Sequence, residues 1–214
     1  MIPKLNGLIL SGGLSTRMGS EKRLLAYHEK PQEQYLYDLL KPFCEEVFVS
    51  INTSQISHLP AIADCFDDMK SPLVGIISAM KAFPNKAWLV IACDMPFINE
   101  DLIAQLISRR NPQMKATGFE NKAIEQDKKK VFTKWIEQEN SPQSISVEPL
   151  ITIYEPAMFS HFMNAYETKR KSVLRVLQQV EVEKIQVSDV TLLQNINTFD
   201  EYQQVKQHVI TPRH

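Results

Sequence analysis

The chain has 214 residues, of which 43% are hydrophobic and 23% are charged, as in an ordinary globular α/β domain with its own core. Its 24 Lys and Arg residues nearly balance its 25 Asp and Glu residues and leave a formal net charge of -1. Such a chain has no global positive field to hold a polyphosphate backbone, which argues against general nucleic-acid binding.

The sequence also argues against several other classes of protein. No apolar run approaches the roughly 18 to 20 residues that a membrane span needs, and residues 1–4 lack the apolar stretch of a secretory signal. We therefore predict a cytoplasmic protein that binds no membrane. The cysteines form no C-x-x-C pair and the histidines show no ligand spacing, so neither a disulfide framework nor a zinc site is indicated.

Short β-rich runs alternate with longer segments of helical period, a pattern that predicts a parallel sheet. The predicted strands are residues 5–10, 47–51, 88–92 and 150–154. The predicted helices are residues 32–43, 74–83, 100–109, 156–167 and 172–180. A last helix is predicted after Thr198, because Thr198 and Glu201 form a capping-box pattern and Phe199, Tyr202 and Val205 share one face.

Residues 120–147 interrupt this rhythm and have the character of an insertion. The segment holds three successive lysines at 128–130 and few strand signals. Apolar residues recur at helical spacing from Val131 to Ile136, which predicts an amphipathic helix over residues 123–138. Two roles stay open for it: packing on the body of the domain with its lysines in solvent, or binding a partner.

The segment after the first strand, residues 10–22, is a candidate phosphate-binding loop. Gly12 and Gly13 let the backbone turn sharply and bring unhindered N–H groups up to an anion. Arg17 and Lys22 add positive charge, and the arginine fork suits two phosphate oxygens. The segment matches neither the Walker A loop nor G-x-G-x-x-G. The alternative is a tight surface turn with basic residues.

Asp94 follows the buried strand at 88–92, at the edge of a parallel sheet where open α/β folds bind their ligands. A carboxylate there suits a Mg²⁺ ion shared with nucleotide phosphates. The alternative is a cap of the following helix, for which Asn99 is better placed. Asn52, after the second strand, is a candidate for contact with the base or ribose, or else the start of an Asx-turn.

Four separated motifs give the chain a family resemblance. They are Leu10-Ser11-Gly12-Gly13 with Arg17-Met18-Gly19 and Lys22, then Ser71-Pro72-Leu73-Val74-Gly75-Ile76, then Cys93-Asp94-Met95-Pro96-Phe97, and finally Asn195-Ile196-Asn197-Thr198. In order and spacing they resemble the MobA-like nucleotidyltransferases, the family of the molybdenum cofactor guanylyltransferases, over nearly the whole chain apart from residues 120–147. The chain departs from the family at Ser71, where Gly is usual, and at Ser11, where Ala is usual.

The resemblance implies one doubly wound α/β domain over residues 1–214, with a mostly parallel sheet and helices on both faces, of the nucleotide-diphospho-sugar transferase type. It also implies an enzyme that transfers GMP from GTP to molybdopterin-bound molybdenum and releases pyrophosphate, with Mg²⁺ as cofactor. The implied partners are GTP and the molybdenum cofactor, and further candidates are other cofactor-biosynthesis proteins and molybdoenzyme chaperones.

The family's residue roles carry over to the matching positions. The implied GTP contacts are Leu10, Ser11, Gly12, Gly13, Arg17, Lys22, Asn52, Asp64, Gly75 and Asp94. Of these, the catalytic candidates are Arg17 with the β- and γ-phosphates, Lys22 on the α-phosphoryl transition state, and Asp94 on Mg²⁺. Asp64 is found by counting back seven residues from Ser71, with Asp67 and Asp68 as rivals. Asn195 and Asn197 would reach the molybdopterin side.

Two other functions stay open. A molybdenum cofactor cytidylyltransferase or a sugar-phosphate nucleotidyltransferase would have the same fold, although relatives that use CTP tend to have Ala-Ala-Gly where this chain has Ser11-Gly12-Gly13. A non-catalytic carrier module for a nucleotide or cofactor belongs to a different class. It would have no physical need for a cation and a metal carboxylate facing each other, as Lys22 and Asp94 would.

Overall fold

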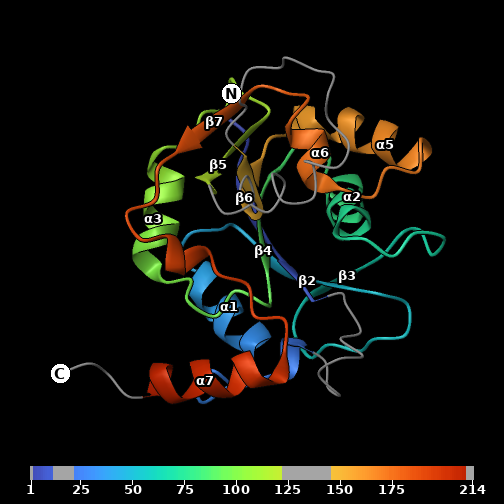
Figure 1. The fold of residues 1–214 in the computed structure, drawn as a ribbon. Helices are drawn as coiled ribbons and strands as arrows, with labels where there is room; N and C mark the ends of the chain where they lie inside the picture. The colour runs from blue at the N-terminus through green and yellow to red at the C-terminus, as the bar shows by residue number, and fades with distance from the viewer. Residues whose placement is uncertain (1, 12–21, 122–145, 211–214) are drawn as a thin grey trace, which may run out of the picture.

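The computed structural model describes residues 2–11, 22–121 and 146–210, with side chains as far as residue 206 (Figure 1). The strands are β1 (Leu5–Leu10), β2 (Val47–Ile51), β3 (Ala61–Ala63), β4 (Ala87–Ala92), β5 (Ala116–Glu120), β6 (Val147–Tyr154) and β7 (Val182–Ile185). The α-helices are α1 (Gln32–Leu40), α2 (Pro72–Ala82), α3 (Glu100–Ser108), α5 (Phe159–Glu167), α6 (Val173–Leu177) and α7 (Phe199–Ile210). Short 3-10 helices are η1 (Lys22–Leu24), η2 (Pro156–Met158) and η3 (Val190–Leu193).

These strands form one seven-stranded sheet in the order β3-β2-β1-β4-β6-β5-β7. β1 pairs in parallel with β2 and β4, β2 with β3, and β5 with β7. The carboxyl ends of β1 to β4 therefore meet along one side, which we call the carboxyl edge. The predicted mostly parallel, doubly wound sheet is confirmed.

One strand corrects the sequence prediction. β6, predicted at residues 150–154 as a member of a parallel sheet, runs antiparallel to both β4 and β5. Its apolar pattern reports burial but contains no information on direction, which the connections decide. As a result β6 begins at the carboxyl edge, whereas a parallel strand in its place would end there.

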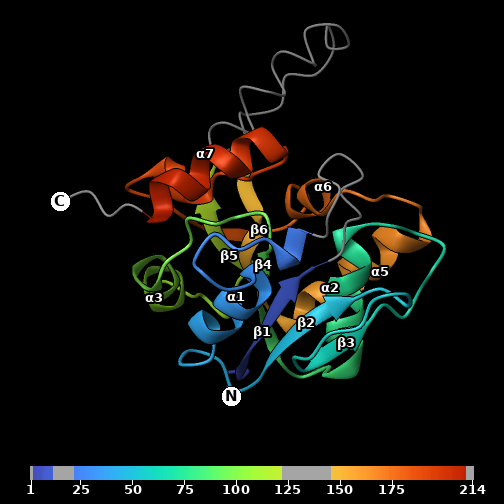
Figure 2. The ribbon, with the colours of Figure 1, turned by 90° about the horizontal axis from the view of Figure 1, so that it is seen from below.

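Helices cover both faces of the sheet (Figures 1 and 2). Alternate side chains of β1 and β4 enter two separate cores, as strand geometry requires. The core on the side of α1 and α3 includes Ile9, Leu36, Leu89, Ile91 and Leu102. The core on the side of α2, α5 and α6 includes Leu8, Ile76, Trp88, Val90 and Phe162. A strand with both faces covered explains why 88–92 is apolar throughout.

The sequence analysis did not predict three of the strands, because each has a weak strand signal in the sequence. β3 has only three residues and lies at the end of the sheet, and β7 has only four. β5 contains Gly118, a residue that usually weakens a strand. Here a Cβ at Gly118 would lie 2.4 Å from Val147 Cγ1 and 2.6 Å from Thr152 Oγ1. The close approach of β6 therefore requires the glycine.

The predicted helices are found at the predicted places, but several are shorter than predicted. α1 and α3 end before residues 43 and 109, and the segment predicted as helical over 172–180 is helical only at Val173–Leu177. The helix predicted from residue 156 begins as the 3-10 turn η2. None of the helices in the described part of the chain is both long and apolar enough to cross a membrane.

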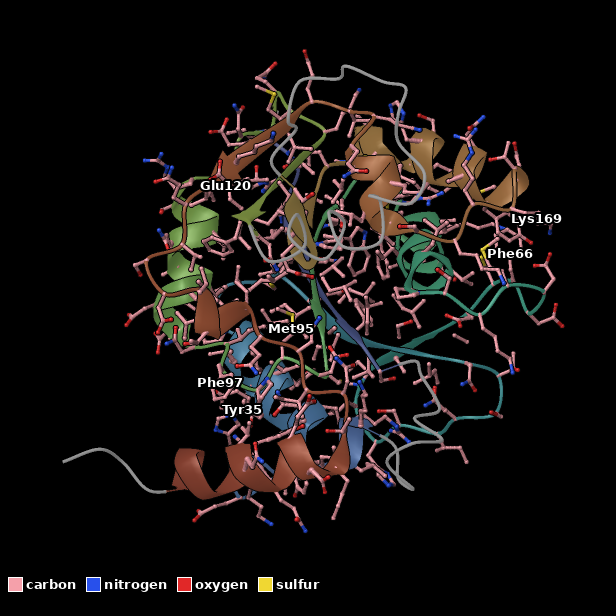
Figure 3. All side chains as sticks on the ribbon, in the orientation of Figure 1. Tyr35, Phe66, Met95, Phe97, Glu120 and Lys169 are labelled. Atoms are coloured by element: carbon pink, nitrogen blue, oxygen red, sulfur yellow. The ribbon has the colours of Figure 1, made fainter. Side chains whose placement is uncertain are left out.

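The insertion leaves and rejoins the sheet at neighbouring points. Glu120, at the end of β5 (Figure 3), pairs with Val147, at the start of β6, so the two ends of the predicted insertion are neighbours in the sheet. The helix predicted over residues 123–138 lies outside the described residues.

The predicted start of α7 is confirmed. The Glu201 N–H donates to Thr198 Oγ1 at 3.2 Å, and Glu201 Oε2 accepts from the Thr198 N–H at 3.1 Å. Below this cap Tyr202 packs edge-on against Tyr27, with ring centroids 4.9 Å apart, and Ile196 joins the same small core. α7 lies beyond the carboxyl edge, separate from the two helical layers (Figure 2).

Candidate active site

One side chain joins three of the four sequence motifs. Lys22, at the start of η1, donates from Nζ to Asp94 Oδ2 at 3.1 Å, to the carbonyl of Ile196 at 3.0 Å and to Asn197 Oδ1 at 3.0 Å. An ammonium has three donors, and each has a partner here. The side chains of Lys22 and Asp94 are 18% and 20% exposed. Lys22 and Asp94 therefore face each other, as expected from the sequence, and Asn197 joins them through a contact that the sequence analysis did not predict.

Backbone contacts fix the position of Asp94. The Ile196 N–H donates to the Asp94 carbonyl at 2.8 Å, so the segment before α7 is attached to the end of β4. Asn99 caps α3 by accepting from the Leu102 N–H at 3.0 Å. The Asp94 carboxylate is therefore not the helix cap, which removes the alternative structural role.

The loop that follows Asp94 is held from the side of α1. His28 Nε2 donates to the Pro96 carbonyl at 2.9 Å, Gln32 to the Met95 carbonyl at 3.3 Å, and Tyr35 to the Ile98 carbonyl at 3.0 Å. Figure 3 shows Met95 at the end of β4 and Phe97 next to Tyr35. Three donors on consecutive parts of one loop leave Asp94 little freedom to move. Burial lowers the pKa of His28, which favours the neutral ring.

Two buried oxygens at this edge have no hydrogen-bond partner within the described residues: Asp94 Oδ1 and Asn195 Oδ1. A buried acceptor without a donor is costly unless a ligand satisfies it. A carboxylate and an amide oxygen are the hard ligands that Mg²⁺ prefers. The described residues contain no cluster of three His, Cys, Asp or Glu side chains. These residues thus fit Mg²⁺ held by few protein oxygens together with substrate phosphates.

A second group of predicted residues gathers beside the ends of β1 and β2. The Ser11 hydroxyl donates to the Ser50 carbonyl, and Ser50 Oγ donates to Asp64 Oδ1 at 3.4 Å. Gly75, on α2, faces the same serine: a Cβ there would lie 2.3 Å from Ser50 Oγ and 3.1 Å from Leu10 Cδ2. Burial raises the pKa of the half-buried Asp64. The structure thus places Leu10, Ser11, Asp64 and Gly75 around Ser50.

Sequence analysis did not single out Ser50. The available signal was a buried polar residue near the end of the apolar strand Val47–Ile51. Of the three rival aspartates, Asp64 is the one beside Ser50. Asp68 instead accepts from Tyr166 and Lys169 on the α5 side, the region of Lys169 and Phe66 in Figure 3, and Asp67 is exposed.

Asn52, a predicted GTP contact, and Ser71, a departure from the family pattern, have local structural roles. Asn52 Oδ1 accepts from the Ser54 N–H at 2.9 Å and from Ser54 Oγ at 2.7 Å, which is the Asx-turn. Ser71 caps α2 by accepting from the Leu73 N–H at 3.2 Å, and its hydroxyl donates to the Lys171 carbonyl at 2.7 Å. The serine at this departure from the family pattern therefore stabilises the helix start.

Gly12, Gly13 and Arg17 lie outside the described residues. The structure therefore describes two groups of candidate site residues at the carboxyl edge. One group consists of Lys22, Asp94, Asn195 and Asn197, and the other is the Ser50 group.

Comparison with known proteins agrees with this arrangement. The model of the MobA-like NTP transferase domain matches residues 7–185. The chain belongs to this family. The molybdenum cofactor biosynthesis bifunctional protein of Synechocystis sp. is 31% identical over 206 residues, which cover 94% of this chain and 53% of that protein. This MobA-like chain thus spans about half the length of that relative.

A shorter relative matches from end to end. The probable molybdenum cofactor guanylyltransferase of Flavobacterium johnsoniae is 27% identical over 92% of this chain and 94% of its own length. Among solved structures, the molybdopterin-guanine dinucleotide biosynthesis protein A of Archaeoglobus fulgidus superposes with a TM-score of 0.69 at 18% identity, covering 95% of this chain and 97% of that one. The MobA-like chain therefore has the predicted nucleotide-diphospho-sugar transferase type of fold.

The contact between Gly75 and Ser50 leads to a stability prediction. In most helices Gly→Ala stabilises by up to about 1 kcal/mol. We expect Gly75→Ala instead to lower the free energy of unfolding by about 1–3 kcal/mol, because the new methyl overlaps Ser50 Oγ. Urea unfolding measures this, and the double variant with Ser50→Ala should recover part of the loss. A Gly75→Ala protein as stable as the parent would show that α2 does not approach β2 this closely.

Proposed function

We propose that this MobA-like chain transfers GMP from GTP to molybdopterin-bound molybdenum and releases pyrophosphate, in the cytoplasm. The observation that carries the proposal is the ammonium of Lys22 held between Asp94 and Asn197 at the carboxyl edge. The choice of substrates is supported by the similarity to the probable molybdenum cofactor guanylyltransferase of Flavobacterium johnsoniae and to the molybdopterin-guanine dinucleotide biosynthesis protein A of Archaeoglobus fulgidus.

The chemistry requires alignment and charge stabilisation rather than a covalent nucleophile. An oxygen of the acceptor's phosphate attacks the α-phosphorus of GTP, and the bond to the bridging oxygen of pyrophosphate breaks. Lys22 offers a compact positive charge to the α-phosphoryl oxygens, where negative charge grows in the transition state. Its three hydrogen bonds orient the ammonium before substrate arrives.

Mg²⁺ is part of the proposal. Asp94 Oδ1 is the primary ligand we assign, and Asn195 Oδ1 is a second buried oxygen at the same edge. When bound, the ion neutralises charge on the substrate phosphates. Arg17 and the Gly12-Gly13 backbone remain the predicted contacts of the β- and γ-phosphates.

The order of the strands supports separate positions for the two proposed substrates. Leu10, Ser11, Asp64 and Gly75 lie by β1 and β2, and β4, with Asp94 after it, lies on the other side of β1. We assign the β1–β2 side to GTP. The acceptor then lies toward β6, and the reacting phosphates meet at Lys22 and Asp94.

Nucleotide choice gives the first functional test. We expect GTP with Mg²⁺ to raise the melting temperature more than ATP, CTP or UTP does, since at equal concentration the ligand that binds the native state most tightly stabilises it most. A thermal-shift series at equal nucleotide concentration, with and without Mg²⁺, measures the order. A larger shift with CTP would instead support a cytidylyltransferase.

Asp94 is tested by removing its charge alone. Asp94→Asn should keep the fold and reduce turnover by about 10² or more, because an amide is a poorer Mg²⁺ ligand where charge develops. Steady-state turnover at saturating Mg²⁺ measures the effect, and Asp101→Asn on the exposed side of α3 is the control. Near-normal turnover in a folded Asp94→Asn protein would exclude the metal role.

Variants of Lys22 distinguish a catalytic protein from a non-catalytic carrier module. Both Lys22→Ala and Lys22→Arg should lose at least about tenfold in kcat, or roughly 1.4 kcal/mol, with a smaller effect on GTP affinity. Arginine does not rescue the activity because a planar fork does not replace a compact ammonium. Single-turnover rates at saturating GTP and molybdopterin decide the matter, with Lys86→Ala at the start of β4 as control. Unchanged rates in both Lys22 variants would place the catalytic cation elsewhere, with Arg17 the next candidate.

A further inference from the structure

Three glutamates are buried within the described part of the chain: Glu33, Glu148 and Glu155. Two of them form ion pairs with arginine. Arg23 Nη1 lies 2.9 Å from Glu33 Oε2, and Arg110 Nε lies 2.6 Å from Glu155 Oε1. Glu148 has no ion pair with a basic residue of the described ranges. Because a buried charge is normally paired, Glu148 requires a different explanation.

The hydrogen bonds of Glu148 leave room for more. Its Oε2 accepts from Asn121 Nδ2 at 2.8 Å, and its Oε1 accepts from the Leu150 N–H at 3.3 Å. An ionised carboxylate has about four acceptor positions, so about two have no donor within residues 2–11, 22–121 and 146–206. Burial, with a smaller effect of Asp94, raises the pKa of Glu148 to about 6. The group is still mostly ionised at pH 7 and can accept hydrogen bonds from a ligand.

Glu148 lies on the acceptor side of the site. It is near the start of β6, and Ile151 pairs with Ile91 of β4. Counting three residues back along β6 and three residues forward from Ile91 places Glu148 level with Asp94, at the carboxyl edge. That Asp94 raises the pKa of Glu148 agrees with this proximity. Since β4 separates β6 from β1 and β2, Glu148 lies across Asp94 from the residues assigned to GTP.

A carboxylate binds most strongly to two adjacent N–H donors that match its two oxygens. The 2-amino-4-oxopyrimidine edge offers such a pair, a ring N–H next to an exocyclic amino group. Guanine has this edge and so does a pterin, so both proposed substrates contain it. The position of Glu148, on the far side of Asp94 from Ser11, Asp64 and Gly75, favours the pterin.

We propose that Glu148, oriented by Asn121, binds the acceptor by accepting hydrogen bonds from the 2-amino-4-oxopyrimidine edge of its pterin ring. This inference rests on the proposed function. It gives the acceptor a specific contact remote from the reacting phosphates, and it explains a buried carboxylate that has no ion pair among the described residues. Glu148 is a binding residue in this account and takes no part in the chemical step.

The test is the variant Glu148→Gln, which keeps the size of the side chain but replaces one acceptor oxygen by a donor amide. We expect the KM for molybdopterin to rise at least about tenfold, with kcat and the Kd of Mg²⁺–GTP within about twofold of the parent. Thr152→Val is the matched control, because the Thr152 hydroxyl donates to the Glu148 carbonyl at 2.6 Å and not to its carboxylate. This control reports any local destabilisation of β6.

A second measurement does not depend on catalysis. Binding of 6-hydroxymethylpterin, followed by its own fluorescence, should weaken at least about tenfold in Glu148→Gln, whereas the 2-oxo analogue of the same ring should bind the parent weakly. An unchanged KM in an active Glu148→Gln enzyme overturns the inference, as does a weakened Kd for GTP with an unchanged KM, which would assign Glu148 to guanine.

The two proposals fail in different ways. Glu148-dependent pterin binding by a protein that transfers no GMP would retain the subsite and reject the proposed activity. Transfer of GMP with no effect of Glu148→Gln on either KM or pterin binding would support the proposed activity and reject the pterin subsite. An inactive parent protein that binds no pterin rejects both.

Discussion

The three hydrogen bonds of the Lys22 ammonium are the interaction on which the site depends. They join η1, the end of β4 and the segment before α7, although Asp94 is 72 residues and Ile196 is 174 residues from Lys22 in the sequence. Such a contact forms only when the strand order is correct, because β1 and β4 must be neighbours for their carboxyl ends to meet. Charge-assisted bonds in a partly buried position are stronger than surface ion pairs, so they also fix the orientation of the ammonium.

Around this cation, several acceptor oxygens of the described residues are not saturated. Asp94 Oδ1 and Asn195 Oδ1 have no partner in the described part of the structure, and Glu148, which is buried, forms no ion pair there. In a structural core such groups would reduce stability. In a site for a metal ion and for ligands with N–H donors they are already oriented, so that binding satisfies them at little reorganisation cost.

The segment before α7 extends this site beyond the part of the chain that the family model matches. That match ends at residue 185, whereas Ile196 and Asn197 supply two of the three contacts of Lys22. Glu201 holds this segment by accepting from the Asn197 N–H at 2.7 Å and the Thr198 N–H at 3.1 Å. A local capping box thus positions the asparagine that contacts Lys22, which links the stability of one helix end to the geometry of the candidate site.

The sequence by itself determined the features that depend on neighbours in the chain. The strands Leu5–Leu10 and Val47–Ile51, the capping box at Thr198 and the position of Asp94 after a buried strand follow from short-range patterns of apolar and capping residues. The motif resemblance then indicated that Lys22 and Asp94 lie together, and the structure shows their side chains in contact.

Only the tertiary structure decided the features that depend on which strands become neighbours. It gave β6 its antiparallel direction, placed Asp64 rather than Asp67 or Asp68 beside Ser50, and brought Glu148 level with Asp94. Periodicity reports that a residue is buried but not what it is buried against. The direction of β6 and the partner of a buried carboxylate arise from contacts between distant segments, and no local pattern in the sequence encodes them.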